Sequence, residues 1–241
     1  MKKKASVMLA LVLAAALAFQ TITKGRLRID IDDALSACYA DVTGDGAEEL
    51  IVLTRSGEST PHGECGKWLY ILSSEDVFLS YRRVISRFDL TAAKPLKVMA
   101  GDVNRDGIKE VSIKAWKTAA FDPQLAQRPF FFNVSRGKLE AVWLGSRLSQ
   151  PFIDYVLTDF DGDGFEEIVS LEQTRASRQQ ISAYRWDSFG FVCFARSDEY
   201  DGLSSIEPQM GVNGIGRVAV LQDGSSQPLR FALRMDKISL D

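Results

Sequence analysis

The chain contains few of the residues that most often carry catalysis. Its 241 residues include one histidine, His62, and three cysteines, Cys38, Cys65 and Cys193. A histidine-based triad would depend wholly on His62, and no G-x-S-x-G motif lies near it. The cysteines show no C-x-x-C spacing, and their odd number allows at most one disulfide. His62, with Glu64 and Cys65 beside it, lacks a second ligand pair at zinc-like spacing, so an exposed loop is favoured over a transition-metal site.

The chain also lacks a surplus of basic residues. Lys and Arg total 29 against 32 Asp and Glu, a formal net charge of −3. A nucleic-acid-binding surface shows as a basic surplus, so no nucleic-acid partner is expected. Gly-x-Gly pairs occur only within the repeated loops described below, which leaves a phosphate-binding glycine loop without support. With 46% hydrophobic residues the chain is long enough to bury a substantial core.

A long apolar run is present only at the N-terminus. Residues 1–18 are predicted to be a signal peptide, with the basic start Lys2–Lys4 and the small-x-small cleavage pattern at Ala16–Ala18. The apolar run over 5–19 is short for a membrane span, which needs about 20 residues. We therefore expect an exported protein, secreted or at the cell surface, with 19–241 as the mature domain. Contact with a membrane is expected only if the segment is not cleaved.

One acidic loop, in contrast, occurs three times, beginning at Asp41, Asp102 and Asp159. Each copy has side-chain oxygens at its first, third, fifth and ninth positions and glycine at its sixth. Such a loop points oxygens inward, as a hard cation such as calcium requires, and glycine suits the turn at the sixth position. We expect two or three calcium ions, with the third loop strongest because it has four acids. The predicted ligands, including the backbone carbonyl of the seventh residue, are Asp41, Thr43, Asp45, Ala47 and Glu49; Asp102, Asn104, Asp106, Ile108 and Glu110; and Asp159, Asp161, Asp163, Phe165 and Glu167.

The helix-loop-helix calcium hand shares only the opening D-x-D-x-D-G of these loops. That hand takes a bidentate Glu at its twelfth position. Here the twelfth positions hold Val52, Ile113 and Ser170. Short apolar runs follow each loop at once, which predicts strands and not helices. The helical hand is therefore rejected.

The three D-x-[DNT]-x-D-G-x-x-E loops resemble the FG-GAP/VCBS (integrin alpha-like) calcium-binding repeats over about residues 35–233. Their starts are 61 residues (41 to 102) and 57 residues (102 to 159) apart, a period typical of solenoids, propellers and arrays. The resemblance implies an all-β fold, a β-propeller or propeller-like array of about four blades, with the calcium loop between the first two strands of a blade. The ninth position departs from integrin-type repeats, since it is Glu here and Asp there. The predicted repeats lie near 35–90, 95–148, 151–200 and, in degenerate form, 203–241.

The degenerate fourth repeat is expected to keep the turn and lose the metal. Residues 211–217 align with the motif, but Gly211, Ile215 and Ala219 stand at the first, fifth and ninth positions. One amide and a carbonyl fall far short of the 6–8 oxygens that calcium takes. A strand is predicted over 218–221.

Between the loops, alternating apolar residues predict further strands. The first, over 26–31, is expected to complete the last repeat. The polar segments 55–67 and 121–128 are interpreted as connecting loops. Four tryptophans could stack on sugars, but each lies in or at the end of a strand pattern, which favours a packing role; they are Trp68, Trp116, Trp143 and Trp186.

The resemblance implies a binding or scaffold module for a protein or glycan partner, and not an enzyme. The alternative is an extracellular polysaccharide-processing enzyme, or its accessory subunit, on a propeller scaffold. That alternative would need acids and bases on one face beyond the metal ligands, and the sequence shows no such cluster. Calcium held by a full set of protein oxygens is also a poor activator of water, since metal catalysis needs an open position.

Overall fold

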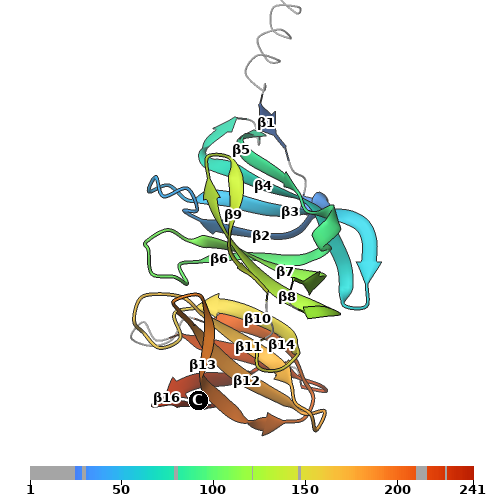
Figure 1. The fold of residues 1–241 in the computed structure, drawn as a ribbon, viewed down its shortest axis with the longest axis vertical. Helices are drawn as coiled ribbons and strands as arrows, with labels where there is room; N and C mark the ends of the chain where they lie inside the picture. Colours follow the sequence, from blue (N-terminus) through green and yellow to red (C-terminus); the bar gives the residue numbers. More distant parts are fainter. Residues whose placement is uncertain are drawn as a thin grey trace, which may run out of the picture.

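The computed structural model is an all-β protein, which confirms the all-β part of the predicted fold class (Figure 1). It describes residues 25–28, 31–78, 81–120, 122–145, 148–209, 216–225 and 227–241. The predicted signal segment, 1–18, lies outside these ranges. Within them, seventeen strands form three sheets of five, four and eight strands. No helix among the described residues has the length and apolar character needed to cross a membrane.

The strands follow one another as four antiparallel meanders, in which each strand pairs with the next. The short 3-10 turns η1 (Ile31–Asp33) and η2 (Thr91–Ala93) precede the first and second meanders. The third and fourth meanders share the eight-stranded sheet through a single parallel bridge, Arg196 with Lys237. The strands are β2 (Ala34–Ala40), β3 (Glu49–Thr60), β4 (Gly63–Phe78) and β5 (Tyr81–Asp89); β6 (Pro95–Gly101), β7 (Glu110–Ala119), β8 (Asp122–Ser135) and β9 (Lys138–Leu144); β10 (Phe152–Thr158), β11 (Glu167–Gln173), β12 (Gln179–Asp187) and β13 (Gly190–Tyr200); and β14 (Leu203–Gln209), β15 (Arg217–Gln222), β16 (Leu229–Arg234) and β17 (Lys237–Leu240).

The core lies where neighbouring meanders meet. The first strands of the meanders, β2, β6, β10 and β14, are neighbours in that order, and each junction encloses one buried apolar cluster. Each cluster takes residues from two neighbouring meanders, so burial of the apolar faces depends on the stack. Pairs that span the three junctions are Ile51 with Ile113, Phe131 with Tyr155, and Val169 with Val218.

The eight-stranded sheet curls until its two end strands, β10 and β14, touch, which makes it nearly a barrel. In Figure 1 the first two meanders form the upper half of the molecule and the other two the lower half. The predicted propeller of four blades stays a prediction.

The first strand pairs differently from the prediction. β1 (Arg26–Leu27) joins the outer edge of the first sheet, where Arg26 lies opposite Arg83 and Leu27 opposite Arg82 on β5. The expectation that this segment completes the last repeat is therefore wrong. Alternation in a sequence identifies a strand but not its partner, and here the free edge of β5 provides the partner.

Two segments expected to be connecting loops are strands instead. The segment 55–67 forms the arms of a long hairpin, paired as far as Thr60 opposite Gly63. Of the segment 121–128, residues 122–128 belong to β8 in the hairpin of β7 and β8, in which Ala119 lies opposite Asp122, while 121 lies outside the described residues. Both hairpins project beyond the core at the right of Figure 1. Their projecting arms bury little, so they lack the apolar alternation by which a strand is recognised.

The fourth meander contains the predicted strand over 218–221 as part of β15, while the loop residues 210–215 lie outside the described residues. The strand pair that closes each acidic loop joins residues nine positions apart, such as Ala40 and Glu49. In the fourth meander the closing pair, Gln209 and Arg217, is eight positions apart. The connection is one residue shorter, so Arg217 and not Ala219 takes the ninth place, and the predicted alignment is wrong.

Candidate functional site

The three acidic loops lie at the same end of the meanders. Residues 41–48 join β2 to β3, residues 102–109 join β6 to β7, and residues 159–166 join β10 to β11. In Figure 1 they follow one another along the left side of the molecule. Because the strands that precede the loops are neighbours, successive loops are neighbours too.

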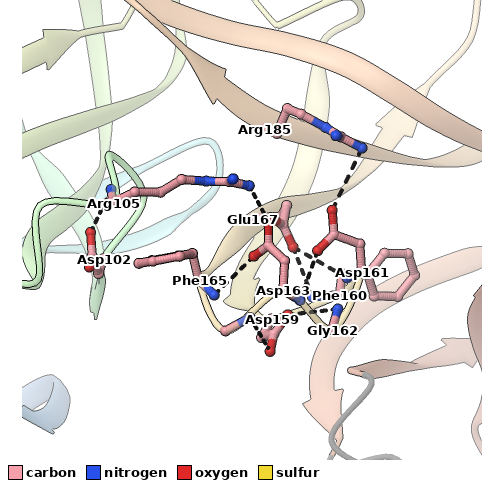
Figure 2. Close-up of polar contacts among 11 residues, drawn as sticks. Asp102, Arg105, Asp159, Phe160, Asp161, Gly162, Asp163, Phe165, Glu167 and Arg185 are labelled. Atoms are coloured by element: carbon pink, nitrogen blue, oxygen red, sulfur yellow. Dashed lines mark hydrogen bonds and ion pairs between the residues drawn. The ribbon is translucent and has the colours of Figure 1, made fainter.

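Each loop is folded by hydrogen bonds to its own acids. In the third loop, Asp159 accepts the N–H groups of Gly162 (2.8 Å) and Gly164 (3.0 Å), and Asp163 accepts that of Phe165 (3.1 Å) (Figure 2). The first and fifth residues therefore shape the loop as well as carrying the predicted ligand oxygens. The corresponding acceptors are Asp41 and Asp45 in the first loop and Asp102 and Asp106 in the second.

The ninth-position glutamates are buried beneath the loops. Glu49, Glu110 and Glu167 are at most 2% exposed, and each accepts the N–H of the second residue of its loop at 2.9–3.1 Å. Burial raises the pKa of Glu110 and Glu167 to about 7 and also raises the pKa of Glu49. A cation beside a buried carboxylate favours its charged form, so these three positions suit metal ligands.

Two of the three loops gather carboxylate groups closely enough to hold a metal ion. In each, oxygens from three acids lie within 4.8 Å of one another. All the side-chain donors are oxygens, the ligand type that hard cations such as calcium prefer. The acids are Asp41, Asp45 and Glu49 in the first loop and Asp159, Asp161 and Glu167 in the third.

The second loop differs because an amide lies among its acids. Asn104 Nδ2 donates to Asp106 Oδ2 (3.0 Å) and to Glu110 Oε1 (2.5 Å), and Asn104 Oδ1 accepts the N–H of Asp106 (2.9 Å). Two acids are thus satisfied by the protons of one amide. No group of three gathered carboxylates forms in this loop among the described residues. The first and second loops have the same number of acids at the predicted ligand positions, but only the first loop brings its three acids close together.

Two arginines engage the acids of the third loop (Figure 2). Arg105, from the second loop, pairs with Asp163 and lies over the ring of Phe165, 5.2 Å from its centroid. Arg185, on β12, approaches Asp161 at 3.6 Å. Asp163, a predicted ligand, is therefore bound to Arg105 and is absent from the group of three gathered acids.

Arg105 holds a backbone conformation that suits glycine. Its φ is 69°, and the fourth positions of the other two loops, also left-handed, are Gly44 (φ 73°) and Gly162 (φ 82°). A side chain in this region is strained. The ion pair with Asp163 and the ring contact offset that strain, so the departure from glycine has a reason in the neighbouring loop. The glycines at position four of the first and third loops are the sequence signal for a left-handed backbone at that position.

Successive loops are also joined through the backbone. Glu166, the eighth residue of the third loop, donates its N–H to the carbonyl of Asp102 (3.2 Å), and its carboxylate accepts the N–H of Asp102 (2.7 Å) and Lys109 Nζ (2.6 Å). Gly216 donates its N–H to the carbonyl of Asp159 (2.7 Å) in the same way. The first residues of the second and third loops, Asp102 and Asp159, are therefore each held by the next meander along the chain.

The seventh residues of the loops are predicted to offer their carbonyl oxygens to the metal. Their N–H groups bond to the fifth-position acids, and the ligand role of their carbonyls stays a prediction. Ile108 packs on the first loop, since a Cβ added to Gly44 would lie 3.3 Å from Ile108 Cδ1. The three residues are Ala47, Ile108 and Phe165.

The residues considered for a transition-metal site do not gather. Glu64 pairs with Arg55, and buried Cys65 lies against Ser56. His62 turns toward the second meander, with its ring centroid 4.5 Å from that of Trp116. All three cysteines are free thiols. Sequence reasoning missed the meeting of His62 with Trp116 because it depends on two projecting hairpins from different meanders.

Comparison with known proteins assigns this chain to no family. Neither a scan of protein-family models nor a search of curated proteins finds a match. The likeness to FG-GAP/VCBS repeats therefore rests on the loop motif and its spacing, and it stays a prediction.

Proposed function

We propose that this chain is an exported, calcium-stabilised repeat protein that acts as a binding or scaffold module for a protein or glycan partner. In this proposal the four meanders are the blades of a propeller-like array of the FG-GAP/VCBS type. One observation carries it: three separate loops have the same sequence pattern and the same hydrogen bonds, and each lies where neighbouring meanders meet. Independent loops would have no reason to share this arrangement unless they perform the same task.

The donor set fits calcium. The first and third loops would hold it through their gathered acids, with Thr43 and Asp163 completing the predicted sets. Bound calcium would supply the positive charge that balances several carboxylates held close together. The loop residues themselves fix the turn, through Asp41 and Asp159, and exclude water from the buried glutamates beneath.

The opposite end of the molecule favours a binding module over the enzyme alternative. A cavity lies there, and its lining includes His62 and two arginines but no Asp or Glu. Sugar hydrolysis usually needs a pair of carboxylic acids flanking the bond to be cleaved. The cavity therefore offers contacts for a ligand without that pair.

The calcium part of the proposal is tested by thermal unfolding with chelator and then with calcium. A ligand that binds only the folded state adds about 2.7 kcal/mol at a hundredfold excess over its Kd. For a domain of this size about 1 kcal/mol moves the unfolding midpoint by roughly 2–4 °C, so we expect a rise of about 5–10 °C for each ion bound. The double variant Asp41→Asn with Asp159→Asn should show little of this rise. A midpoint that responds to neither calcium nor chelator would contradict the proposal.

The binding part is tested on a glycan and peptide array with the calcium-loaded chain. Capture of a probe without chemical change supports the module. Release of a cleaved product would instead support the polysaccharide-processing alternative.

A further inference from the structure

A cavity of about 530 Å³ lies at the end of the meanders opposite the acidic loops. Its volume is within the range of sites that hold small ligands, about 300–1,000 Å³. Three meanders contribute to it: the β3–β4 hairpin of the first, the β7–β8 hairpin of the second with the segment 148–152 that leads into the third, and the β11–β12 turn. The two hairpins are those that project beyond the core at the right of Figure 1. Their projecting parts form a large share of its lining.

One wall is an aromatic corner formed by His62 and Trp116, whose rings are tilted at 60°. The imidazole is held by Gln127, whose Nε2 lies 3.1 Å from His62 Nδ1 and also donates to the carbonyl of Phe152 (3.2 Å). A neutral imidazole with its proton on Nε2 would accept a hydrogen bond from Gln127 at Nδ1. The pKa of His62 is lowered by burial and by the charge of Lys114, which agrees with that state. An aromatic corner of this kind suits the C–H face of a sugar ring.

The polar part of the lining is rich in amides. Gln124, Gln127 and Gln150 line the cavity together with Ser149. Amide and hydroxyl groups both donate and accept hydrogen bonds, and so do the hydroxyls of a sugar. The Oε1 atom of Gln127 is buried and has no hydrogen-bond partner within the described residues. A buried acceptor without a partner is costly, and a donor on a ligand would remove that cost.

The charge of the lining is positive. Arg128 is buried and paired with Asp122 at 2.8 Å, so its charge is already balanced. Arg175, on the turn between β11 and β12, is exposed, and no ion pair joins it to an acid in the part of the chain that the structure describes. An arginine in this position is suited to a carboxylate, which it can bind through two parallel hydrogen bonds.

We propose that this cavity binds an acidic oligosaccharide, with a sugar ring packed in the corner of His62 and Trp116 and a uronate carboxylate paired with Arg175. The proposal rests on the binding function proposed above and names the chemical class of its partner. A peptide with an acidic end would satisfy Arg175, but it would use few of the amide groups. A hydroxyl-rich ligand uses the amides and the cation together.

The test compares two disaccharides that differ only in the carboxylate, cellobiouronic acid and cellobiose. Binding to the calcium-loaded chain is followed by NMR titration, together with a short acidic peptide. We expect cellobiouronic acid to bind at least tenfold more tightly than cellobiose and than the peptide. Equal binding of the two sugars, or tighter binding of the peptide, would overturn the proposal.

Matched variants localise the binding. Trp116→Ala and Arg175→Gln should each weaken binding of cellobiouronic acid at least tenfold. Trp68→Ala removes a tryptophan outside the lining, and Arg178→Gln removes an arginine three residues from Arg175 that pairs with Asp201; both should change binding less than twofold. Unchanged binding in Trp116→Ala overturns the cavity as the site.

Failure here is distinguishable from failure of the calcium proposal. A chain that is stabilised by calcium but binds none of the probes refutes the cavity ligand and leaves the calcium loops standing. A chain that binds cellobiouronic acid in the cavity but ignores calcium supports the ligand and refutes the calcium loops.

Discussion

The two ends of the meanders are built in different ways. At the loop end, three segments with one sequence pattern form one hydrogen-bonding arrangement three times, and each contacts the next. At the hairpin end, two hairpins of different length and sequence and the β11–β12 turn place His62, Trp116 and Arg175 in the lining of one cavity. In the proposed function, the repeated loops serve as the scaffold, and the hairpins that depart from the repeat provide the surface that a ligand recognises. A fold does not specify function, and function depends on sites built onto it.

The largest expected effect comes from breaking the loop end. Asp159→Ala removes the acceptor of two backbone N–H groups, and hydrogen bonds to a charged group are worth about 1.5–3 kcal/mol each before solvent exposure weakens them. We expect the free energy of unfolding to fall by about 1–3 kcal/mol. Urea unfolding in chelator measures this without a contribution from calcium. The matched control Asp187→Ala changes an exposed acid outside the loops and should cost less than about 0.5 kcal/mol.

A second variant tests the contact between the second and third loops, the ion pair of Arg105 with Asp163. Arg105→Gly removes the ion pair that occupies Asp163, so the calcium affinity of the third loop should rise about fivefold. The same change relieves a left-handed backbone in the second loop, whose strain is about 1–2 kcal/mol. Calorimetry on the purified chain measures the affinity. Arg136→Gly is the control, since Arg136 also has a positive φ, 48°, but lies in the β8–β9 turn. Equal affinities in the two variants would show that Asp163 is not restrained by Arg105.

The second loop offers a variant that makes it resemble its neighbours. Asn104→Asp replaces the amide that bridges Asp106 and Glu110 with a fourth acid. In chelator we expect a loss of stability of about 1 kcal/mol, because two hydrogen bonds become a like-charge contact. In calcium the rise of the melting midpoint should exceed that of the unaltered chain. A smaller calcium response in Asn104→Asp would contradict the view that the Asn104 amide satisfies Asp106 and Glu110 in place of calcium.

The smallest effect concerns β11, the strand that runs from the third acidic loop to the turn with Arg175. Glu172 on this strand is fully buried and accepts hydrogen bonds from Ser170, Ser182 and Tyr184. Burial raises its pKa above the ordinary 4.5, and Arg196 opposes the shift. The folded state therefore holds the proton more tightly than the unfolded state, so this group contributes most stability at low pH and loses it as pH rises through the folded pKa.

Glu172→Gln removes that titration. Urea unfolding between pH 4.5 and pH 8 should show a weaker decline of stability with rising pH than in the unaltered chain. Glu199→Gln, on β13 of the same sheet, serves as the control for loss of one carboxylate outside the core. An unchanged pH profile in Glu172→Gln would show that Glu172 does not titrate differently on folding.

The sequence predicted the loop end well because that information is local. Ligand spacing, the glycine at position six and the following apolar run all lie within about twelve residues, so the turn and its strands could be read directly. The role of Arg105 could not, since its partner Asp163 is in the next repeat. The same limit explains β1, whose alternating pattern carries no information about the edge of β5.

The hairpin end could not be predicted for a related reason. The polar segments 55–67 and 121–128 resemble loops by composition, but most of 55–67 and all of 122–128 form strands through pairing beyond the core. From the sequence, His62 could be interpreted only through its neighbours Glu64 and Cys65. In the structure its contacts come from the second meander. In the fourth meander the error came from the motif itself. The alignment that started at Gly211 did not allow for a connection one residue shorter, which the pairing of Gln209 with Arg217 reveals.

The most direct test of the central claim is the number of calcium ions bound to the chain. Equilibrium dialysis against calcium, with magnesium in excess, should give two or three ions per chain, and Asp159→Ala should remove one of them. The first and third loops account for two ions, and the second accounts for the third if its amide is displaced. A chain that binds no calcium, or that keeps its full number in Asp159→Ala, would contradict the account.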